Sequence, residues 1–175
     1  MKLRSTWMRS VLVAAAGLLF VGSYAMAGDS KEKKFHARLD GAQETPSIST
    51  GATGTFRATL NPAGDELSFE LEYSGLEGGD TLFAHVHLGQ FDVPGGVMFF
   101  LCGGGGKPAC PNGSGTVTGT VNAGNIIGPS GQGITAGQLA EAIRAMRDGI
   151  AYANVHTTNF PAGEIRGQVN HHKGE

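Results

Sequence analysis

Three histidines in this sequence have the residue type and spacing of a transition-metal site. His85 and His87 alternate within residues 83–88, Phe-Ala-His-Val-His-Leu, so in a strand both imidazoles point to one face. His156 lies in a second such segment, residues 152–157, and is a candidate third ligand. Imidazole suits both copper and zinc, so this set predicts a metal site. The same residues can also form a hydrogen-bonded cluster that holds no metal.

Polar residues on the same segments are candidates for a second layer around these histidines. Asn154 shares the face of His156, and Glu164 and Arg166 alternate with apolar residues in residues 163–169. If the apolar side chains face the core, all of these polar groups fall on outer faces. They form one cluster only if the strands are neighbours, which alternation alone does not establish. Without a metal, Glu164 would pair with Arg166 or with a histidine.

The two cysteines predict a disulfide. Cys102 and Cys110 enclose the sequence Gly-Gly-Gly-Gly-Lys-Pro-Ala, and their spacing matches no common zinc pattern. In an oxidising compartment two such cysteines pair and restrain the glycine-rich loop between them.

A period of two dominates the chain and predicts short strands. The clearest case is residues 66–73, where apolar and polar residues alternate strictly after a turn at 61–65, which predicts a hairpin with the preceding strand. Eight strands are expected, at residues 35–39, 55–60, 66–73, 82–88, 97–101, 115–121, 150–156 and 164–169. With 29 glycines available for turns, the pattern predicts an all-β antiparallel sandwich or barrel.

One segment has helical periodicity instead. Residues 135–147 place apolar side chains on one face, Thr135 and Gln138 form a capping-box pair, and Gly149 provides a C-terminal stop. We therefore expect one short helix among the strands.

The N-terminus has the features of a secretory signal peptide. Basic residues precede an apolar run of about twelve residues, and Ala25-Met26-Ala27 is a small-residue cleavage site before Gly28. The run is shorter than a membrane span, which needs roughly 20 residues. We expect a signal peptide at 1–27, a polar leader at 28–34, one domain at 35–170 and a polar tail at 171–175. The protein is then secreted or periplasmic, with no membrane span in the mature chain.

Charge excludes some partners. The full chain has 13 basic and 15 acidic residues, and three of the basic ones leave with the signal peptide. The mature chain is therefore anionic and has no basic stripe, which argues against binding to nucleic acid or anionic lipid.

Several motifs resemble the CHRD domain, a family first described in chordin. They are Phe-His-Ala-Arg-Leu-Asp-Gly-Ala-Gln-Glu-Thr-Pro at 35–46, Ala-His-Val-His at 84–87, Tyr-Ala-Asn-Val-His-Thr at 152–157 and Pro-Ala-Gly-Glu-Ile-Arg-Gly-Gln at 161–168. The resemblance spans residues 35–169. It implies an immunoglobulin-like Greek-key β-barrel but no established activity.

A more distant likeness is to Cu,Zn superoxide dismutase. It implies that His85, His87 and His156 are copper ligands and that Arg166 guides an anion. No histidine lies between Gly89 and His156, so the bridging ligand and the zinc ligands of that enzyme are missing. A mononuclear copper site therefore fits the sequence better than a complete dismutase does.

The function expected from the sequence is an exported binding or scaffold module for an unidentified protein or surface partner. No complete catalytic constellation is present, so an enzyme is not the first expectation. The alternative is a copper protein with a mononuclear histidine site, and a dismutase-like enzyme ranks last.

Overall fold

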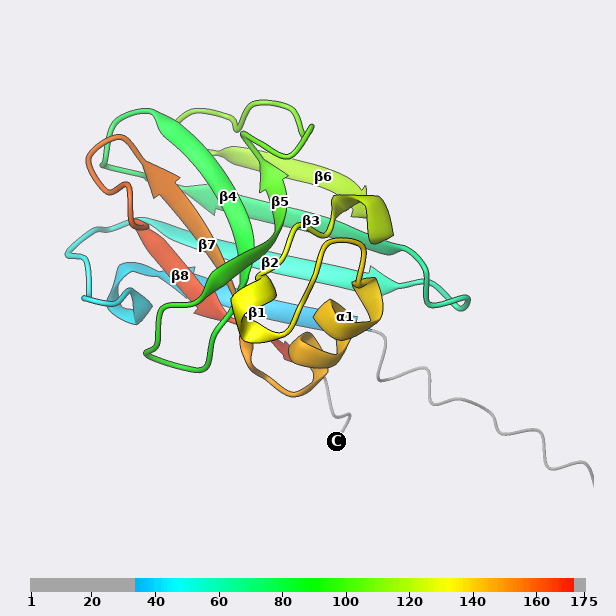
Figure 1. Cartoon of the computed structure of the whole chain (residues 1–175). Coiled ribbons are helices and arrows are strands. Elements are labelled where there is room, and N and C mark those ends of the chain that lie inside the picture. The colour runs from blue at the N-terminus through cyan, green and yellow to red at the C-terminus, as the bar shows by residue number, and fades with distance from the viewer. Residues whose placement is uncertain (1–33, 172–175) are drawn as a thin grey trace, which may run out of the picture.

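The computed structural model describes residues 34–171 as an all-β domain with one short α-helix (Figure 1). The expected signal peptide, nearly all of the leader and residues 172–175 lie outside the described residues. The strands are β1 Lys34–Asp40, β2 Thr53–Leu60, β3 Leu67–Ser74, β4 Thr81–Leu88, β5 Gly96–Cys102, β6 Gly115–Val121, β7 Ala151–Thr157, β8 Ile165–Gln168 and β9 Asn170–His171. All eight expected strands are present, each within two residues of its expected start and end, and β9 is an additional two-residue strand.

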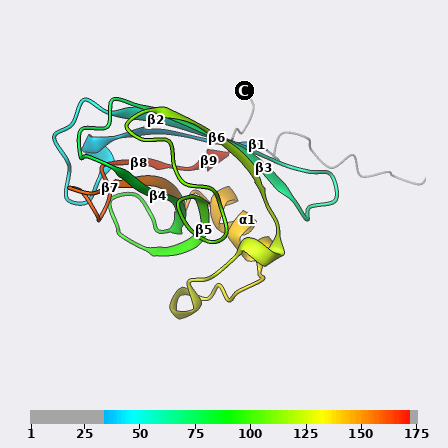
Figure 2. The ribbon, with the colours of Figure 1, turned by 90° about the horizontal axis from the view of Figure 1, so that it is seen from above.

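The strands form one antiparallel sheet that curls into a nearly closed barrel. Their order is β5-β4-β7-β8-β1-β2-β3-β6, with β9 paired to β1. Seen from above, β1, β2, β3 and β6 form one layer and β4, β5 and β7 another (Figure 2). The edge strands β5 and β6 face each other without a hydrogen-bonded ladder. This topology makes β7 the neighbour of β4, although 62 residues separate them in sequence.

The core follows the alternation expected from the sequence. In β3, Leu67, Phe69, Leu71 and Tyr73 are buried, while the residues between them face solvent. The predicted hairpin is confirmed, because β2 pairs with β3 from Thr53↔Ser74 to Leu60↔Leu67.

The helix begins later than the sequence predicts. The structure has α1 at Leu139–Arg147, with Gln138 as its N-cap, so the expected start at Thr135 is wrong. Gly137 has φ +87°, a left-handed conformation that no α-helix can include. The Gln138 side chain still accepts a hydrogen bond from the Thr135 backbone N–H at 2.7 Å, but this pair closes a turn before the helix. The expected stop at Gly149 is confirmed by its φ of +69°.

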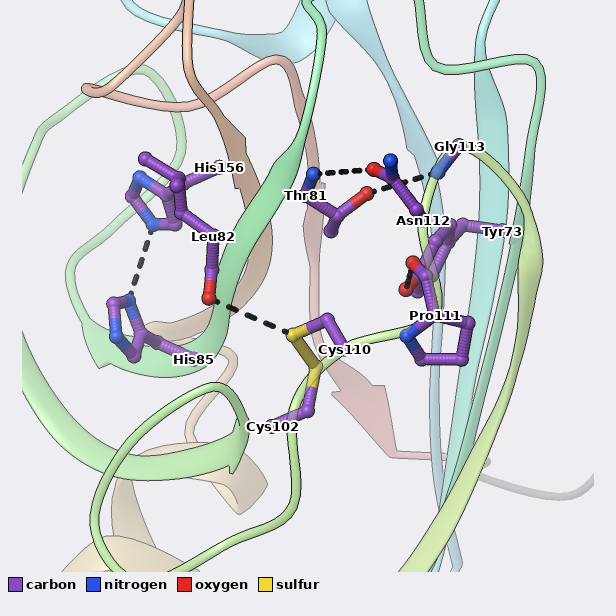
Figure 3. The surroundings of a disulfide bond; sticks show 10 residues. All are labelled: Tyr73, Thr81, Leu82, His85, Cys102, Cys110, Pro111, Asn112, Gly113 and His156. Atoms are coloured by element: carbon purple, nitrogen blue, oxygen red, sulfur yellow. Dashed lines mark hydrogen bonds between the residues drawn. A yellow bond between two sulfur atoms is a disulfide. The ribbon is translucent and has the colours of Figure 1, made fainter.

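The predicted disulfide is confirmed between Cys102, at the end of β5, and Cys110. The residues after Cys110 are bonded to neighbouring strands (Figure 3). The Thr81 N–H donates to Asn112 Oδ1 at 2.8 Å, and the Tyr73 hydroxyl donates to the Pro111 carbonyl at 2.5 Å. The disulfide therefore ties edge strand β5 to a segment that is anchored on β3 and β4.

Replacing both cysteines with serine is expected to lower the free energy of unfolding by about 2 kcal/mol, because the closed loop is short. Chemical denaturation of the oxidised protein and the double variant measures this difference. With a reductant present, the two proteins should unfold alike. A double variant as stable as the oxidised parent would contradict the expectation.

Candidate metal centre

The structure brings the three predicted histidines together. His85 and His87 lie on β4, and His156 lies on the adjacent strand β7. Each residue offers one ligand atom, and these three atoms lie within 4.8 Å of one another. The closest contact joins His85 Nδ1 to His156 Nε2 at 3.1 Å (Figure 3). The strands that carry the histidines are therefore neighbours, which the sequence alone could not establish.

Backbone carbonyls fix the protonation of two rings. A carbonyl oxygen only accepts, so His87 donates from Nδ1 to the Gly95 carbonyl at 3.0 Å, and His156 donates from Nδ1 to the Pro161 carbonyl at 3.1 Å. In the neutral rings both Nε2 atoms therefore carry a lone pair and no proton. Metal-binding histidines typically have their second nitrogen held in this way.

The third ring, His85, carries its proton on Nδ1. Since His156 Nε2 is unprotonated, His85 Nδ1 is the donor in the contact between them. His85 Nε2 and His87 Nε2 are both buried without a hydrogen-bond partner. An ion that entered between His85 and His156 would replace the shared proton, and His85 would then carry its proton on Nε2.

The histidine face points away from the core as expected, but it is covered. Ala84 and Val86 are fully buried on the core side, while the three histidines are only 6–7% exposed on the other side. Aromatic rings enclose them. Phe100 lies edge-on to His85 with ring centroids 4.3 Å apart, and Tyr152 stacks on His87 at 4.7 Å. The site is thus a buried polar layer beneath loops and not an open outer face.

Burial keeps these imidazoles neutral. It is the main cause that lowers the pKa of His85 to about 3, and the neighbouring His156 and His87 lower it further. Burial likewise lowers the pKa of His87 to about 4 and lowers the pKa of His156. Neutral imidazole is the form that binds metal, so protonation would not block a metal at these nitrogens until well below neutral pH.

Arg166 packs beside this cluster and holds a loop over it. Its guanidinium carbon lies 3.5 Å from the centre of the Tyr152 ring, and Nη2 donates to the carbonyls of Gln90 and Val93 at 2.9 and 3.1 Å. The side chain is buried. The loop between β4 and β5 is further held by Tyr152, whose hydroxyl accepts from the Gly95 N–H at 3.0 Å.

Asn154, on the strand beside the histidines of β4, bonds to a buried carboxyl group. It lies opposite His85 on β4 and opposite Arg166 on β8, and its Nδ2 donates to Glu44 Oε1 at 2.7 Å. Asn154 Oδ1 is buried without a partner. Burial raises the pKa of Glu44 to about 7, although the Arg166 charge and the Asn154 hydrogen bond act in the opposite direction.

Glu44→Gln is expected to remove a pH-dependent loss of stability. Because the folded-state pKa of Glu44 lies above the ordinary 4.5, the wild type loses stability as pH rises from about 4.5 to 7. The variant should match the wild type at pH 4 and exceed its free energy of unfolding by about 3 kcal/mol at pH 8. Urea unfolding of both metal-free proteins across this range measures the difference. The histidines affect both proteins equally, so a constant difference at all pH values would contradict the assignment.

Glu164 lies in a separate network. Its Oε1 accepts from the Thr50 hydroxyl at 2.9 Å and the Glu77 N–H at 2.7 Å, and its Oε2 accepts from the Gly78 N–H at 3.0 Å and the Thr157 hydroxyl at 2.8 Å. None of these partners is a histidine or Arg166. The fully buried carboxylate therefore links the loop after β3 to β7 and β8, and the structure does not bring it to the histidines.

Sequence reasoning missed several parts of the site. The carbonyls of Gly95 and Pro161 have no side-chain signal, because any residue supplies a backbone oxygen. Glu44 has no local signal either, because its contact with Asn154 depends on the tertiary fold. Tyr152 could have been found, since it precedes Asn154 by two residues and therefore shares the histidine face.

The fold and the motifs together define an all-β domain with a histidine cluster on one face. The family model of the CHRD domain matches residues 35–169. The chain therefore belongs to the CHRD domain family. No curated protein and no solved structure matches the chain.

Proposed function

We propose that this CHRD domain protein binds a transition-metal ion through His85, His87 and His156, and that copper is its metal. The observation that carries the proposal is the convergence of three buried, neutral imidazoles from two paired strands. The Nε2 atoms of His87 and His156 carry no proton, because the opposite ring nitrogens donate to backbone carbonyls. The lone pair on His87 Nε2 has no hydrogen-bond partner, and that on His156 Nε2 accepts only from His85. Three nitrogen ligands suit copper and zinc among the common biological metals.

The spacing requires only a small adjustment around an ion. Nitrogens bound at about 2.0–2.1 Å to one ion lie roughly 3–4 Å from one another. The widest separation among the three ligand atoms, 4.8 Å, must shrink by about 1 Å. His85 and His87 are on one strand and His156 is on the next, so side-chain rotation can supply this movement. In this role the metal would provide a Lewis-acidic or redox-active centre.

We further propose that the protein works outside the cytoplasm. The disulfide fits an oxidising compartment, and the signal peptide expected at residues 1–27 would direct the chain there. Among residues 34–171, no helix is long and apolar enough to cross a membrane.

Metal content tests the proposal directly. The mature protein, purified without a histidine tag, is exposed to copper and zinc, passed through a desalting column and measured by mass spectrometry. We expect about one copper per chain. The His85→Ala/His87→Ala double variant should bind none, since it loses two of three ligands.

A matched control separates ligand loss from general damage. His36→Ala removes an imidazole from β1, outside the histidine cluster, and should leave copper binding unchanged. Circular dichroism verifies that the double variant is folded. A folded double variant that binds copper like the parent would refute the ligand assignment. A superoxide assay on the copper-loaded protein then tests the dismutase alternative, with Arg166 as the anion guide.

The second candidate function is a binding or scaffold module for a protein or surface partner. It is favoured by Phe91 and Val93, which are 59% and 40% exposed in the loop between β4 and β5. A pull-down from the protein's own secreted fraction tests this alternative, with Phe91→Ser/Val93→Ser as the control. If the parent repeatedly captures no more than this variant, the partner hypothesis is contradicted.

A further inference from the structure

We propose that the three-histidine centre selects Cu(I) over Cu(II) and Zn(II). This inference rests on the proposed metal-binding function and specifies the ion that the site takes. It follows from the number of ligands, the surroundings of the imidazoles and a fixed positive charge nearby.

The number of ligands favours a monovalent ion. Among the described residues, the candidate group consists of three histidines and includes no carboxylate. The nearby carboxyl groups are engaged elsewhere, since Glu44 bonds to Asn154 and Glu164 accepts four other hydrogen bonds. Zn(II) prefers four tetrahedral ligands and Cu(II) prefers a tetragonal set, so each would need a further ligand, such as a water molecule, at this buried site. Cu(I) needs no fourth ligand and can bind to three neutral nitrogens alone.

The surroundings of the three histidines make it unfavourable to bury a highly charged ion there. Each of the three histidines is at most 7% exposed, so bulk water does little to stabilise an ion held between them. Aromatic rings provide much of the packing. Phe100 and Phe83 lie 4.3 and 5.7 Å from His85, measured between ring centroids, and Tyr152 covers one face of His87. With neutral ligands the bound complex keeps the full charge of its ion, and a divalent ion therefore costs more to bury than a monovalent one.

Arg166 adds a permanent positive charge to this environment. Its guanidinium stacks on Tyr152 at 3.5 Å, and the Tyr152 ring in turn stacks on His87 at 4.7 Å. The side chain is 3% exposed, so solvent screens it poorly. Arginine stays charged at every relevant pH. Its repulsion acts on any cation at the histidines and is twice as large for a divalent ion.

Competition with chromophoric chelators tests the selection. Cu(I) is supplied as its bathocuproine disulfonate complex with ascorbate and without thiols, and Zn(II) and Cu(II) are supplied as nitrilotriacetate complexes. We expect the dissociation constant for Cu(I) to be lower than that for either divalent ion by about 100-fold or more. A divalent ion that bound stoichiometrically and as tightly as Cu(I) would overturn the inference and leave the proposed function standing. Failure to bind any of the three ions would instead overturn the proposed function.

A pair of variants isolates the electrostatic contribution. Arg166→Gln removes the charge, and Arg166→Lys keeps it. We expect the ratio of Cu(I) to Zn(II) affinity to fall about tenfold in the glutamine variant and to stay near the parental value in the lysine variant. If Arg166 had a purely structural role, its replacement would weaken the binding of both ions alike and leave the ratio of their affinities unchanged. An unchanged ratio in Arg166→Gln would therefore contradict the electrostatic argument.

Discussion

At pH 5 the three-histidine site is expected to hold its metal almost as tightly as at pH 7. Exposed histidines with a pKa near 6.5 become protonated over this range, and three of them would together lose roughly 10⁴-fold in affinity. Here burial lowers the pKa of His85 to about 3 and of His87 to about 4, and it lowers the pKa of His156 as well. Protons therefore compete little with the metal, and the affinity should change by less than about tenfold. Chelator competition at the two pH values measures this change.

The packing of Phe100 provides a control for this expectation. The ring lies edge-on to His85, and Phe100→Ser would admit water to that imidazole. The pKa of His85 should then rise toward its ordinary value, and metal affinity should fall more steeply with acid. Phe91→Ser removes an exposed ring and should keep the parental pH profile. If the parent released its metal between pH 7 and pH 5 as an exposed site does, burial could not be what keeps the histidines neutral.

Glu164→Gln is expected to lower the free energy of unfolding by about 3 kcal/mol, since hydrogen bonds to a charged group contribute about 1.5–3 kcal/mol each. The carboxylate accepts four hydrogen bonds, two of them from the backbone N–H groups of Glu77 and Gly78. An amide in its place turns an N–H donor toward groups that themselves donate. The side chain is fully buried, so water cannot replace the lost acceptor.

Urea unfolding compares this variant with Glu70→Gln. Glu70 is exposed on β3 and its carboxylate lies 3.8 Å from the Arg57 guanidinium, a surface pair whose loss should cost less than 1 kcal/mol. The two variants carry the same chemical change in opposite environments. Equal effects on stability would contradict the role assigned to the Glu164 network.

Local sequence patterns predicted the strands well because one face of most strands is buried. Strict alternation in β3 indicated which of its side chains are buried, and the turn before it indicated that β2 and β3 form a hairpin. The same reasoning placed His85 and His87 on a common face. The predicted start of the helix α1 was wrong because a capping-box pattern does not reveal that Gly137 adopts a left-handed conformation.

The surroundings of the histidines could not be predicted in the same way. His87 bonds to the loop between β4 and β5, which has no periodicity and is held by Arg166 through backbone carbonyls. The pairing of β4 with β7 is a long-range contact that alternation cannot specify. Glu164 appeared beside Arg166 in sequence, yet its hydrogen bonds are to distant residues such as Thr50 and Gly78.

The separation of the histidines along the chain would determine when the proposed metal site can be filled. His85 and His156 are 71 residues apart in sequence and meet only through the pairing of β4 with β7. In a chain that crosses a membrane unfolded, His85 and His87 would be close together, but His156 would not be near them. The proposed site would therefore be empty on arrival, and its metal would come from the compartment in which the protein folds.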